Sequence, residues 1–138
     1  MKAALGMTKE EITPSQRSID YVVGKYDLDT YDMLGQMPVY NKYQGWEGAT
    51  DRATRLVSIG PPAFKSEGYL AAVIGHEGVH ATQWTTPNWA RTMTQPMREM
   101  QASQWMLDNA TRLYNTPAEI KSFQAYYDGW ATMSFDNN

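Results

Sequence analysis

Residues 75–80 read Gly-His-Glu-Gly-Val-His, and the two histidines of this stretch, His76 and His80, are the only histidines in the chain. In an α-helix, residues four apart lie one turn apart on the same face. The two imidazoles can therefore reach one metal ion, and Glu77 can lie beside that ion rather than on it. We interpret the other elements as those that hold this helix, complete the metal shell and present a substrate to it.

The composition limits both the size of the fold and its metal chemistry. Residues 1–138 are expected to form one domain, alone or as a piece of a longer protein, and the chain is long enough to bury a core. It has no cysteine, which excludes a disulfide framework and a cysteine-ligated zinc site. Any zinc ion must therefore be bound by histidine and carboxylate side chains.

Charge and hydropathy argue against two classes of partner. The formal net charge is -3 and no basic run is present, which argues against nucleic acid as the main partner. No stretch approaches the roughly 20 apolar residues of a membrane-spanning helix. The apolar stretch within residues 1–7 is too brief for a signal-peptide core, so we expect a soluble domain whose export signal, if one exists, lies elsewhere.

Hydrophobic periodicity and capping residues predict an α+β fold, with a small mixed sheet packed beside several helices. Residues 25–50 are rich in tyrosine without a clean period, and we expect loops there with a short strand at residues 39–40. This aromatic segment either walls a substrate groove or packs onto the core. The other expected elements are helices over 8–24, 67–84, 96–114 and from 116 onward, and a strand over 54–59. The expected helix caps are Thr13 to Gln16, Ser66, Thr94 or Gln95, and Thr116 to Glu119.

Two features near the motif bear on substrate binding. The strand over 54–59 comes just before the motif helix, where a free strand edge beside the metal can bind an extended peptide by backbone hydrogen bonds. The alternative is a covered strand without a substrate role. Gly75 and Gly78 each cost about 1 kcal/mol in a helix interior relative to alanine. Their presence predicts close approach by another backbone or by the substrate.

A catalytic zinc ion needs a third protein ligand besides His76 and His80, and without a third histidine this ligand must be a carboxylate. Glu99 is the best candidate because it lies in the first turns of the next predicted helix, among apolar and small neighbours. A glutamate in that position could instead serve only the helix dipole. The other candidate ligands are Glu67, Asp108, Glu119 and Asp128.

These residues together indicate metal-assisted hydrolysis. Zinc lowers the pKa of a bound water toward about 7, and Glu77 would accept its proton as general base and pass it to the leaving amine. The oxyanion needs a further hydrogen-bond donor. Without a spare histidine, that donor must be a Tyr, Arg or Lys side chain or the backbone. Candidates on the C-terminal helices are Tyr114, Tyr126 and Tyr127, each of which could instead be an ordinary core or surface aromatic residue. Gln83, three residues after His80, lines the site, orients a ligand or has an ordinary polar role at the helix end.

The motif and the glutamate downstream of it resemble the zincin superfamily of metallopeptidases, and more narrowly the gluzincins, whose third ligand is a glutamate. The matching segments are residues 76–80 and residues 99–102, Glu-Met-Gln-Ala. The resemblance implies that the two histidines and Glu99 bind Zn²⁺ and that Glu77 is the catalytic base of a peptidase. Many gluzincins place an aspartate four residues after the third ligand, where this chain has Ser103. The group that orients a ligating histidine is then expected to be Asp108 or a backbone carbonyl.

The layout of residues 54–130 is also similar to compact HExxH domains at the C-terminal ends of bacterial polymorphic toxins and secretion-system effectors. This resemblance implies a secreted or delivered effector with a peptide or protein substrate, and a cognate inhibitor or immunity protein as a further partner. Two other functions stay open. One is a non-catalytic binding module on a zincin scaffold, and the other is a metal amidase that cleaves cell-wall crosslinks.

Overall fold

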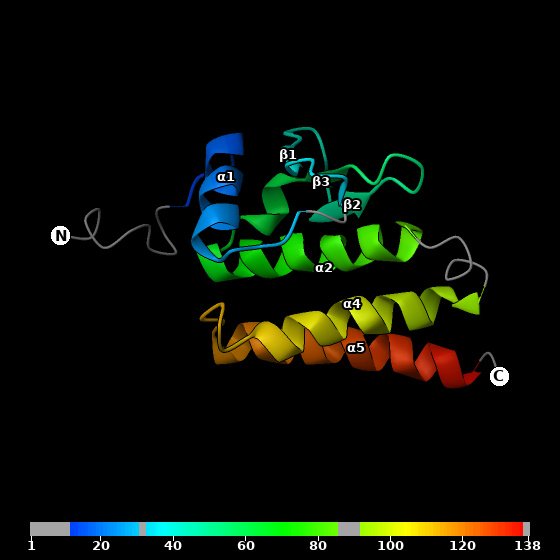
Figure 1. The fold of residues 1–138 in the computed structure, drawn as a ribbon. Helices are drawn as coiled ribbons and strands as arrows, with labels where there is room; N and C mark the ends of the chain where they lie inside the picture. The colour runs from blue at the N-terminus through cyan, green and yellow to red at the C-terminus, as the bar shows by residue number, and fades with distance from the viewer. Residues whose placement is uncertain (1–11, 31–32, 86–91, 137–138) are drawn as a thin grey trace.

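The computed structural model describes residues 12–30, 33–85 and 92–136, which form an α+β fold of four helices and one three-stranded mixed sheet, as predicted. In chain order the elements are α1 (Gln16–Lys25), β1 (Val39–Tyr40), β2 (Gly48–Thr50), β3 (Val57–Ile59), a 3₁₀ turn (Pro61–Ala63), α2 (Glu67–Thr85), α4 (Gln95–Asn109) and α5 (Pro117–Asp136). Figure 1 shows α1 and the sheet on one side of α2, and the antiparallel pair of α4 and α5 on the other.

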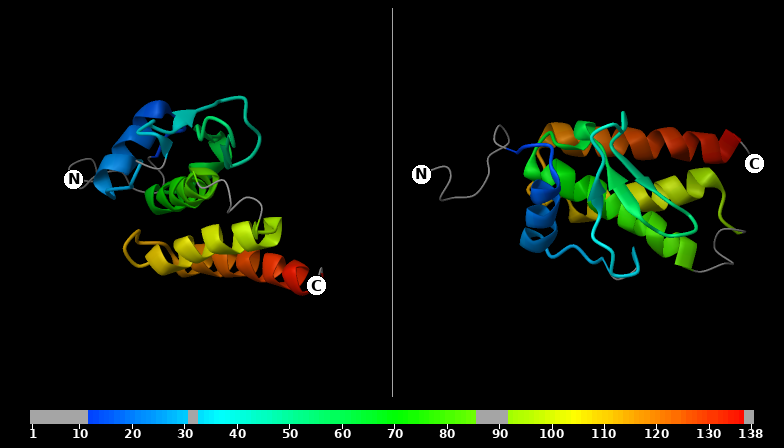
Figure 2. Two further views of the ribbon diagram at one scale, coloured as in Figure 1. Left: turned by 45° about the vertical axis from the view of Figure 1, so that its right-hand side comes forward. Right: turned by 90° about the horizontal axis from the view of Figure 1, so that it is seen from above.

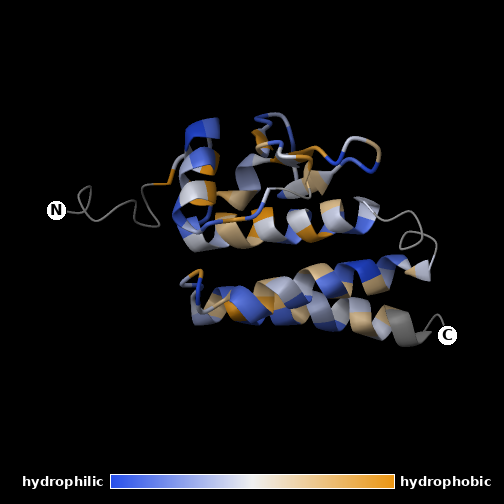
Figure 3. Ribbon diagram, viewed as in Figure 1, coloured by the Kyte–Doolittle hydropathy of each residue, from blue (hydrophilic) through white to orange (hydrophobic). Residues whose placement is uncertain are grey.

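The helix that carries the motif, α2, is buried on nearly its whole circumference because it lies between these two layers. Leu70, Ala71 and Ile74 have no exposed surface, as expected of a helix that is largely apolar all round. Figure 3 shows the strongest hydrophobic colouring on α1, the strands and α2. The helix begins at its predicted cap, since the hydroxyl of Ser66 accepts a hydrogen bond from the amide of Tyr69 at 3.0 Å.

The predicted starts of α4 and α5 are also confirmed. Thr94 caps α4, whose end at Asn109 is earlier than predicted because residues 110–114 form turns. α5 begins with the complete capping box: the amide of Glu119 donates to Oγ1 of Thr116, and the amide of Thr116 donates to Oε1 of Glu119, both at 3.1 Å. The hydroxyl of Ser66 also donates to Oε2 of Glu119 at 2.8 Å, which joins the start of α2 to the start of α5.

The first helix differs from its prediction at its start. We expected it over residues 8–24 with Thr13 in the capping position, but residues 8–11 lie outside the described part of the chain. The N-cap is Ser15, whose hydroxyl accepts from the amide of Ser18 at 3.2 Å. The carbonyl of Thr13 instead accepts from the hydroxyl of Ser18 at 2.7 Å, so that this residue belongs to the turn that leads into the helix.

β3 is the central strand of the sheet, with β1 parallel to it on one side and β2 antiparallel on the other. The strand predicted over 54–59 is shorter than expected, at Val57–Ile59, and of its two alternatives the free edge is wrong and the covered strand is confirmed, because both edges of β3 are paired. The outer strand β2, which begins at Gly48 in a segment predicted to be loop, packs against α2. Figure 2 shows the strands lying over α2 when the molecule is viewed from above.

The two glycines of the motif region allow close approach, but by side chains rather than by a backbone or the substrate. A Cβ on Gly75 would overlap the ring of Trp105, which α4 directs against α2. A Cβ on Gly78 would lie 3.0 Å from the terminal methyl carbon of Met33. Gly75 therefore lets an indole ring lie directly on the backbone of α2, and this contact sets the separation of α2 from α4.

Candidate metal centre

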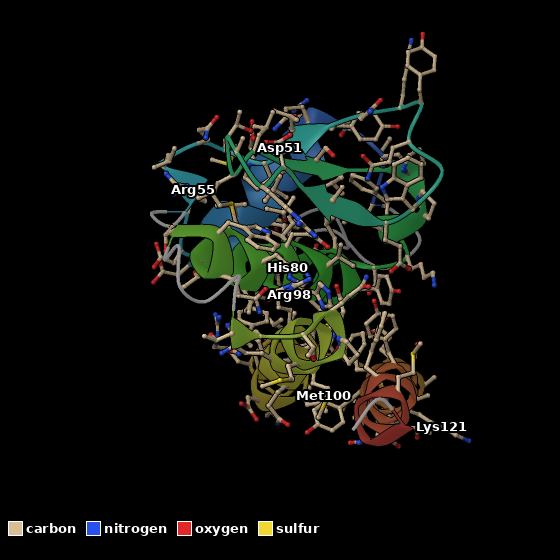
Figure 4. The ribbon with its side chains drawn as sticks, turned by 90° about the vertical axis from the view of Figure 1, so that its right-hand side faces the viewer. Asp51, Arg55, His80, Arg98, Met100 and Lys121 are labelled. Carbon is tan, nitrogen blue, oxygen red and sulfur yellow. The ribbon has the colours of Figure 1, made fainter. Side chains whose placement is uncertain are left out.

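His76, His80 and Glu99 meet at the junction of α2 and α4. Nε2 of His76 lies 3.3 Å from Oε1 of Glu99, and Nε2 of His80 lies 3.2 Å from Oε2 of the same carboxylate. One ligand atom from each residue lies within 4.8 Å of the others. Both histidines are buried and Glu99 is half-buried. Figure 4 shows His80 at this junction, close to Arg98 of α4.

The spacing of these three side chains fits a small divalent metal ion. Zn²⁺ binds histidine nitrogen and carboxylate oxygen at about 2.0–2.2 Å with tetrahedral geometry, so two ligand atoms of such a site lie roughly 3.3–3.6 Å apart. The observed separations of 3.3 and 3.2 Å are close to this value. Two imidazoles with one carboxylate are also a ligand set of catalytic zinc sites. These two distances run to different oxygens of Glu99, and one ligand atom from each residue lies within 4.8 Å of the others, so the group could hold a metal ion.

The charges at this junction favour a cation. Burial alone would raise the pKa of the Glu99 carboxyl, but hydrogen bonds from His76 and His80 hold that pKa well below its usual range. Burial alone would lower the pKa of His80, but Glu99, Glu77 and Gln83 together raise it above its ordinary value. The carboxylate is thus ionised at neutral pH, and its surroundings stabilise positive charge at the imidazole of His80.

Two further side chains contact the imidazoles at Nδ1, the ring nitrogen that does not face Glu99. Nδ1 of His80 donates to Oε1 of the fully buried Gln83 at 2.9 Å. This assigns Gln83 the orienting role, one of the three roles that the sequence left open. Nδ1 of His76 lies 3.3 Å from the sulfur of Met106, a weak acceptor on α4 that sequence reasoning missed. A methionine among apolar residues carries no pattern that would distinguish this role from core packing.

The expectation that Asp108 or a backbone carbonyl orients a ligating histidine is wrong. Asp108 follows Glu99 by nine residues, which places it roughly 180° around α4 on the opposite face. Ser103, at the position where many gluzincins have aspartate, donates to the backbone carbonyl of Glu99 at 2.7 Å. The hydroxyl of Ser103 therefore bonds to the backbone of its own helix rather than to a histidine.

The alternative carboxylate ligands lie outside this group. Glu67 forms an ion pair with Lys25 of α1 at 2.7 Å. Glu119 belongs to the capping box of α5. Asp108 and Asp128 are exposed and accept hydrogen bonds from glutamines one turn earlier on their own helices. Of the five candidate carboxylates, the structure brings only Glu99 together with the two histidines.

Glu77 is held beside this group by β2. The hydroxyl of Thr50 lies 2.7 Å from Oε1 of Glu77 and 3.0 Å from its backbone carbonyl oxygen. A Cβ on Gly48 would lie 2.8 Å from Cγ of Glu77, so a glycine is needed where the strand passes this side chain. The sequence alone did not predict that Gly48 and Thr50 contact Glu77. Their place in a strand depends on pairing with β3 rather than on their own β-propensities.

Of the three tyrosines considered as oxyanion donors, Tyr126 lies at the metal centre. Its hydroxyl donates to Oε1 of Glu99 at 3.1 Å, and its ring centroid lies 5.8 Å from that of His76. Burial and the negative charge of Glu99 raise the pKa of Tyr126 to about 12, so the phenol stays protonated and can donate at neutral pH. Tyr127 lines a separate hollow that also contains Asp108, and Tyr114 is exposed.

Two adjoining cavities meet at the metal centre, and both are lined by Gly48, His76, Glu77 and Tyr126. The first, which we name the arginine cavity, has a volume of about 260 Å³. It is also lined by Arg52, His80, Trp84, Gln95, Arg98 and Glu99. The second, the aromatic cavity, has a volume of about 520 Å³ and is also lined by Trp46, Tyr69, Met106 and Phe123. A substrate that crossed the metal centre would contact both.

The segment over 25–50 packs onto the core at Tyr26 and lines a cavity at Trp46, whereas its role as the wall of a substrate groove stays a prediction. Tyr26 is buried in the core, and the hydroxyl of this residue lies 3.2 Å from Glu67 at the start of α2. Trp46 is exposed and lines the aromatic cavity. The segment therefore contributes to the core at one end and to the cavity wall near β2.

Comparison with protein-family models, with curated proteins and with solved structures finds no match to this chain. In the described part of the chain, no helix combines the length and the apolar character needed to cross a membrane. The chemistry of the metal centre is therefore interpreted from its own geometry.

Proposed function

We propose that this chain is a zincin-like, zinc-dependent hydrolase that cleaves amide bonds in peptides or proteins. One observation supports it above all: the imidazoles of His76 and His80 and both oxygens of Glu99 approach one another at 3.3 and 3.2 Å. A further carboxylate, Glu77, lines the same cavity without belonging to that group. Three ligands with a separate carboxylate beside them is the arrangement that metal-assisted hydrolysis requires.

The residues of the chain have distinct parts in this reaction. Zn²⁺ held by the three ligands would supply Lewis acidity, which acidifies a water molecule and polarises the substrate carbonyl. Oε1 of Glu77 is engaged by Thr50, which leaves Oε2 to accept the proton of the attacking water. Glu77 then passes that proton to the nitrogen of the leaving amine. The hydrogen bond from Thr50 keeps the carboxylate in one orientation through both transfers.

Tyr126 is the proposed oxyanion donor. In the structure its hydroxyl donates to Glu99 at 3.1 Å, and it lines both cavities where they meet. When a substrate carbonyl lies in the cleft, the same hydroxyl can turn from Glu99 to the oxygen on which negative charge develops. The protonated state of the phenol at neutral pH makes this donation available without a prior proton transfer.

The substitution Glu77→Gln tests the hydrolase directly. It keeps the shape of the side chain and an acceptor for Thr50 but removes the base, so kcat for peptide hydrolysis should fall by about 10²- to 10⁴-fold. Bound zinc, measured by elemental analysis, should stay equal to that of the wild type. Asp20→Asn, an exposed change on α1, is the control and should alter neither quantity.

Two results would contradict the proposed function. Unchanged hydrolysis in Glu77→Gln would remove the general base from the mechanism. Zinc bound by the wild type without hydrolysis of any member of a peptide library, or of peptidoglycan crosslinks, would favour a non-catalytic binding module. Hydrolysis of the crosslinks alone would identify an amidase in place of a peptidase.

A further inference from the structure

Trp84 continues the row of metal ligands along α2. His76, His80 and Trp84 lie at four-residue intervals on this helix and therefore share one face. Two guanidinium groups pack on this indole: Cζ of Arg52 lies 4.5 Å from the ring centroid, and Cζ of Arg98 lies 5.0 Å from it. All of these side chains line the arginine cavity. The two cations thus lie one helical turn beyond the last histidine ligand.

The two arginines reach the cavity from different layers of the fold. In Figure 4, Asp51, the neighbour of Arg52, lies in the sheet layer, whereas Arg98 lies on α4. Nη1 of Arg98 donates to the backbone carbonyl of Met93 at 2.7 Å, which fixes the guanidinium. Arg52 follows Asp51 in the chain. Oδ1 of Asp51 accepts hydrogen bonds from the backbone amides of Ala53 and Thr54, at 2.9 and 2.8 Å. The hydrogen bonds of Asp51 order the backbone that carries Arg52, whereas the guanidinium of Arg98 is itself held and loses less conformational entropy when it binds a ligand.

Neither guanidinium group forms an ion pair with an acid among the residues that the structure describes, although the negative charge of Glu99 acts on Arg98 from a greater distance. Every ion pair within 4.0 Å in that part of the chain involves other cations. The two acids of the arginine cavity, Glu77 and Glu99, are engaged by Thr50 and by the imidazoles. The positive charge of Arg52 acts on Arg98 and lowers the pKa of that guanidinium further than burial alone does, and an anion bound in the cavity that both arginines line would offset this repulsion.

We infer that the arginine cavity binds a carboxylate of the substrate, either an acidic side chain or the C-terminal carboxylate, one or two residues from the scissile amide bond. Guanidinium groups bind carboxylates by two parallel hydrogen bonds, which favours this class of anion on a peptide. The four residues from His80 to Trp84 rise about 6 Å along the helix axis, and an extended peptide spans about 3.3–3.6 Å per residue. The inference rests on the proposed function, because the metal centre marks the position of the scissile bond.

The test compares Arg52→Gln with the wild type on octapeptides that carry Asp or Asn at one position at a time. Each peptide is made with a free and with an amidated C-terminus, so that the two sources of carboxylate are distinguished. Arg52 is exposed and is not one of the metal ligands, so zinc content should be unchanged. We expect the preference of the wild type for one carboxylate position, in kcat/KM, to fall about tenfold in Arg52→Gln. Arg17→Gln, an equal change of charge on the exposed face of α1, should keep the full preference.

Binding supplies a readout that does not depend on turnover. Calorimetry on zinc-loaded Glu77→Gln protein should show tighter binding of the carboxylate peptide than of its neutral partner. Adding Arg52→Gln should weaken only the former, by about tenfold. In Arg52→Glu, the preferred peptide should become the one with Lys at that position. If Arg52→Gln weakened the binding of charged and neutral peptides equally, or weakened neither, the inference would be overturned.

These outcomes are separate from those that test the hydrolase. If the wild type cleaves peptides without any preference that Arg52 controls, the hydrolase stands and the carboxylate site is wrong. If no peptide is cleaved but the carboxylate peptide binds in an Arg52-dependent way, the carboxylate site stands and the hydrolase is wrong.

Discussion

Gly48 and Thr50 contact the side chain of Glu77 and fix its position. They are two residues apart on β2, so they face the same way, toward α2. Thr50 supplies a hydroxyl within 2.7 Å of the carboxylate, and Gly48 supplies space for the side-chain carbons. The orientation of the proposed base is thus a property of the strand as well as of the helix that carries it.

Replacement of Gly48 by alanine should impair catalysis without loss of metal. The new Cβ would lie 2.8 Å from Cγ of Glu77, so the carboxylate must move. Because a displacement of about 1 Å can cost on the order of 10²-fold in rate, we expect kcat for peptide hydrolysis to fall at least tenfold. Zinc content should match that of the wild type. Gly129→Ala on α5, where a Cβ meets nothing within 4 Å, is the matched control, and full activity in Gly48→Ala would contradict this account.

The residues of the metal centre differ in how far the sequence predicts them. The positions of His76, Glu77 and His80 follow from helical spacing alone. The prediction of Glu99 depends on where a second helix packs. Glu99 was nevertheless the best candidate, because the site needs a carboxylate and its sequence neighbours are apolar or small. Thr50 could not be predicted, because its contact with Glu77 depends on how a short strand packs on α2.

Among the elements, α2 and α4 pack most closely where Trp105 lies against Gly75. A helix interior normally disfavours glycine by about 1 kcal/mol relative to alanine. Here the missing side chain admits a large ring, and the burial of that ring offsets the cost. Gly78 faces a different side chain, because the flexible end of Met33 lies against it. The two glycines of the motif region therefore differ in how they respond to substitution.

Gly75→Ala should lower the free energy of unfolding by about 1–3 kcal/mol through overpacking against Trp105, in spite of the better helix propensity of alanine. Gly78→Ala should be close to neutral or stabilising, because the methyl end of Met33 can move aside. Urea denaturation of the two variants beside the wild type measures both effects. Equal stability of the two variants would show that the indole does not set the helix separation.

The helices were predicted better than the sheet, for physical reasons. Ser66 and the pair Thr116 and Glu119 are capping residues whose effect is local, so the starts of α2 and α5 follow from a few neighbouring positions. β2 has the sequence Gly-Ala-Thr, in which only threonine favours a strand. Its hydrogen bonds come from β3, several residues further along the chain, and no local pattern reports that pairing.

On the scale of the whole molecule, the candidate metal centre lies between the two layers of the fold. The two histidines belong to α2, which packs under the sheet, and Glu99 belongs to the pair of α4 and α5 on the other side. A metal ion bound by all three would link these layers in the folded state only. The α+β class could be predicted from the order of the elements, whereas this division into layers depends on tertiary packing.

Zinc should therefore stabilise the folded chain. At a free zinc concentration about 100-fold above Kd, the free energy of unfolding should rise by about 2.7 kcal/mol, and a chelator should reverse the change. Glu99→Ala should abolish most of this rise, measured by denaturation with and without zinc. Asp108→Ala, on the opposite face of α4, should retain it. An undiminished rise in Glu99→Ala would place the third ligand elsewhere.

The amide of Gln83 has a consequence for the state of His80 before any ion binds. Both amide hydrogens are committed to α4, one to the carbonyl of Arg98 at 3.1 Å and one to Oε1 of Gln101 at 2.8 Å. The amide cannot flip without losing both bonds, so its oxygen stays turned to the imidazole. Nε2 of His80 donates to Glu99 in the structure, so when His80 gives up one proton it keeps the one on Nδ1 and presents a lone pair at Nε2. An uncharged side chain thus selects the tautomer that can coordinate a metal.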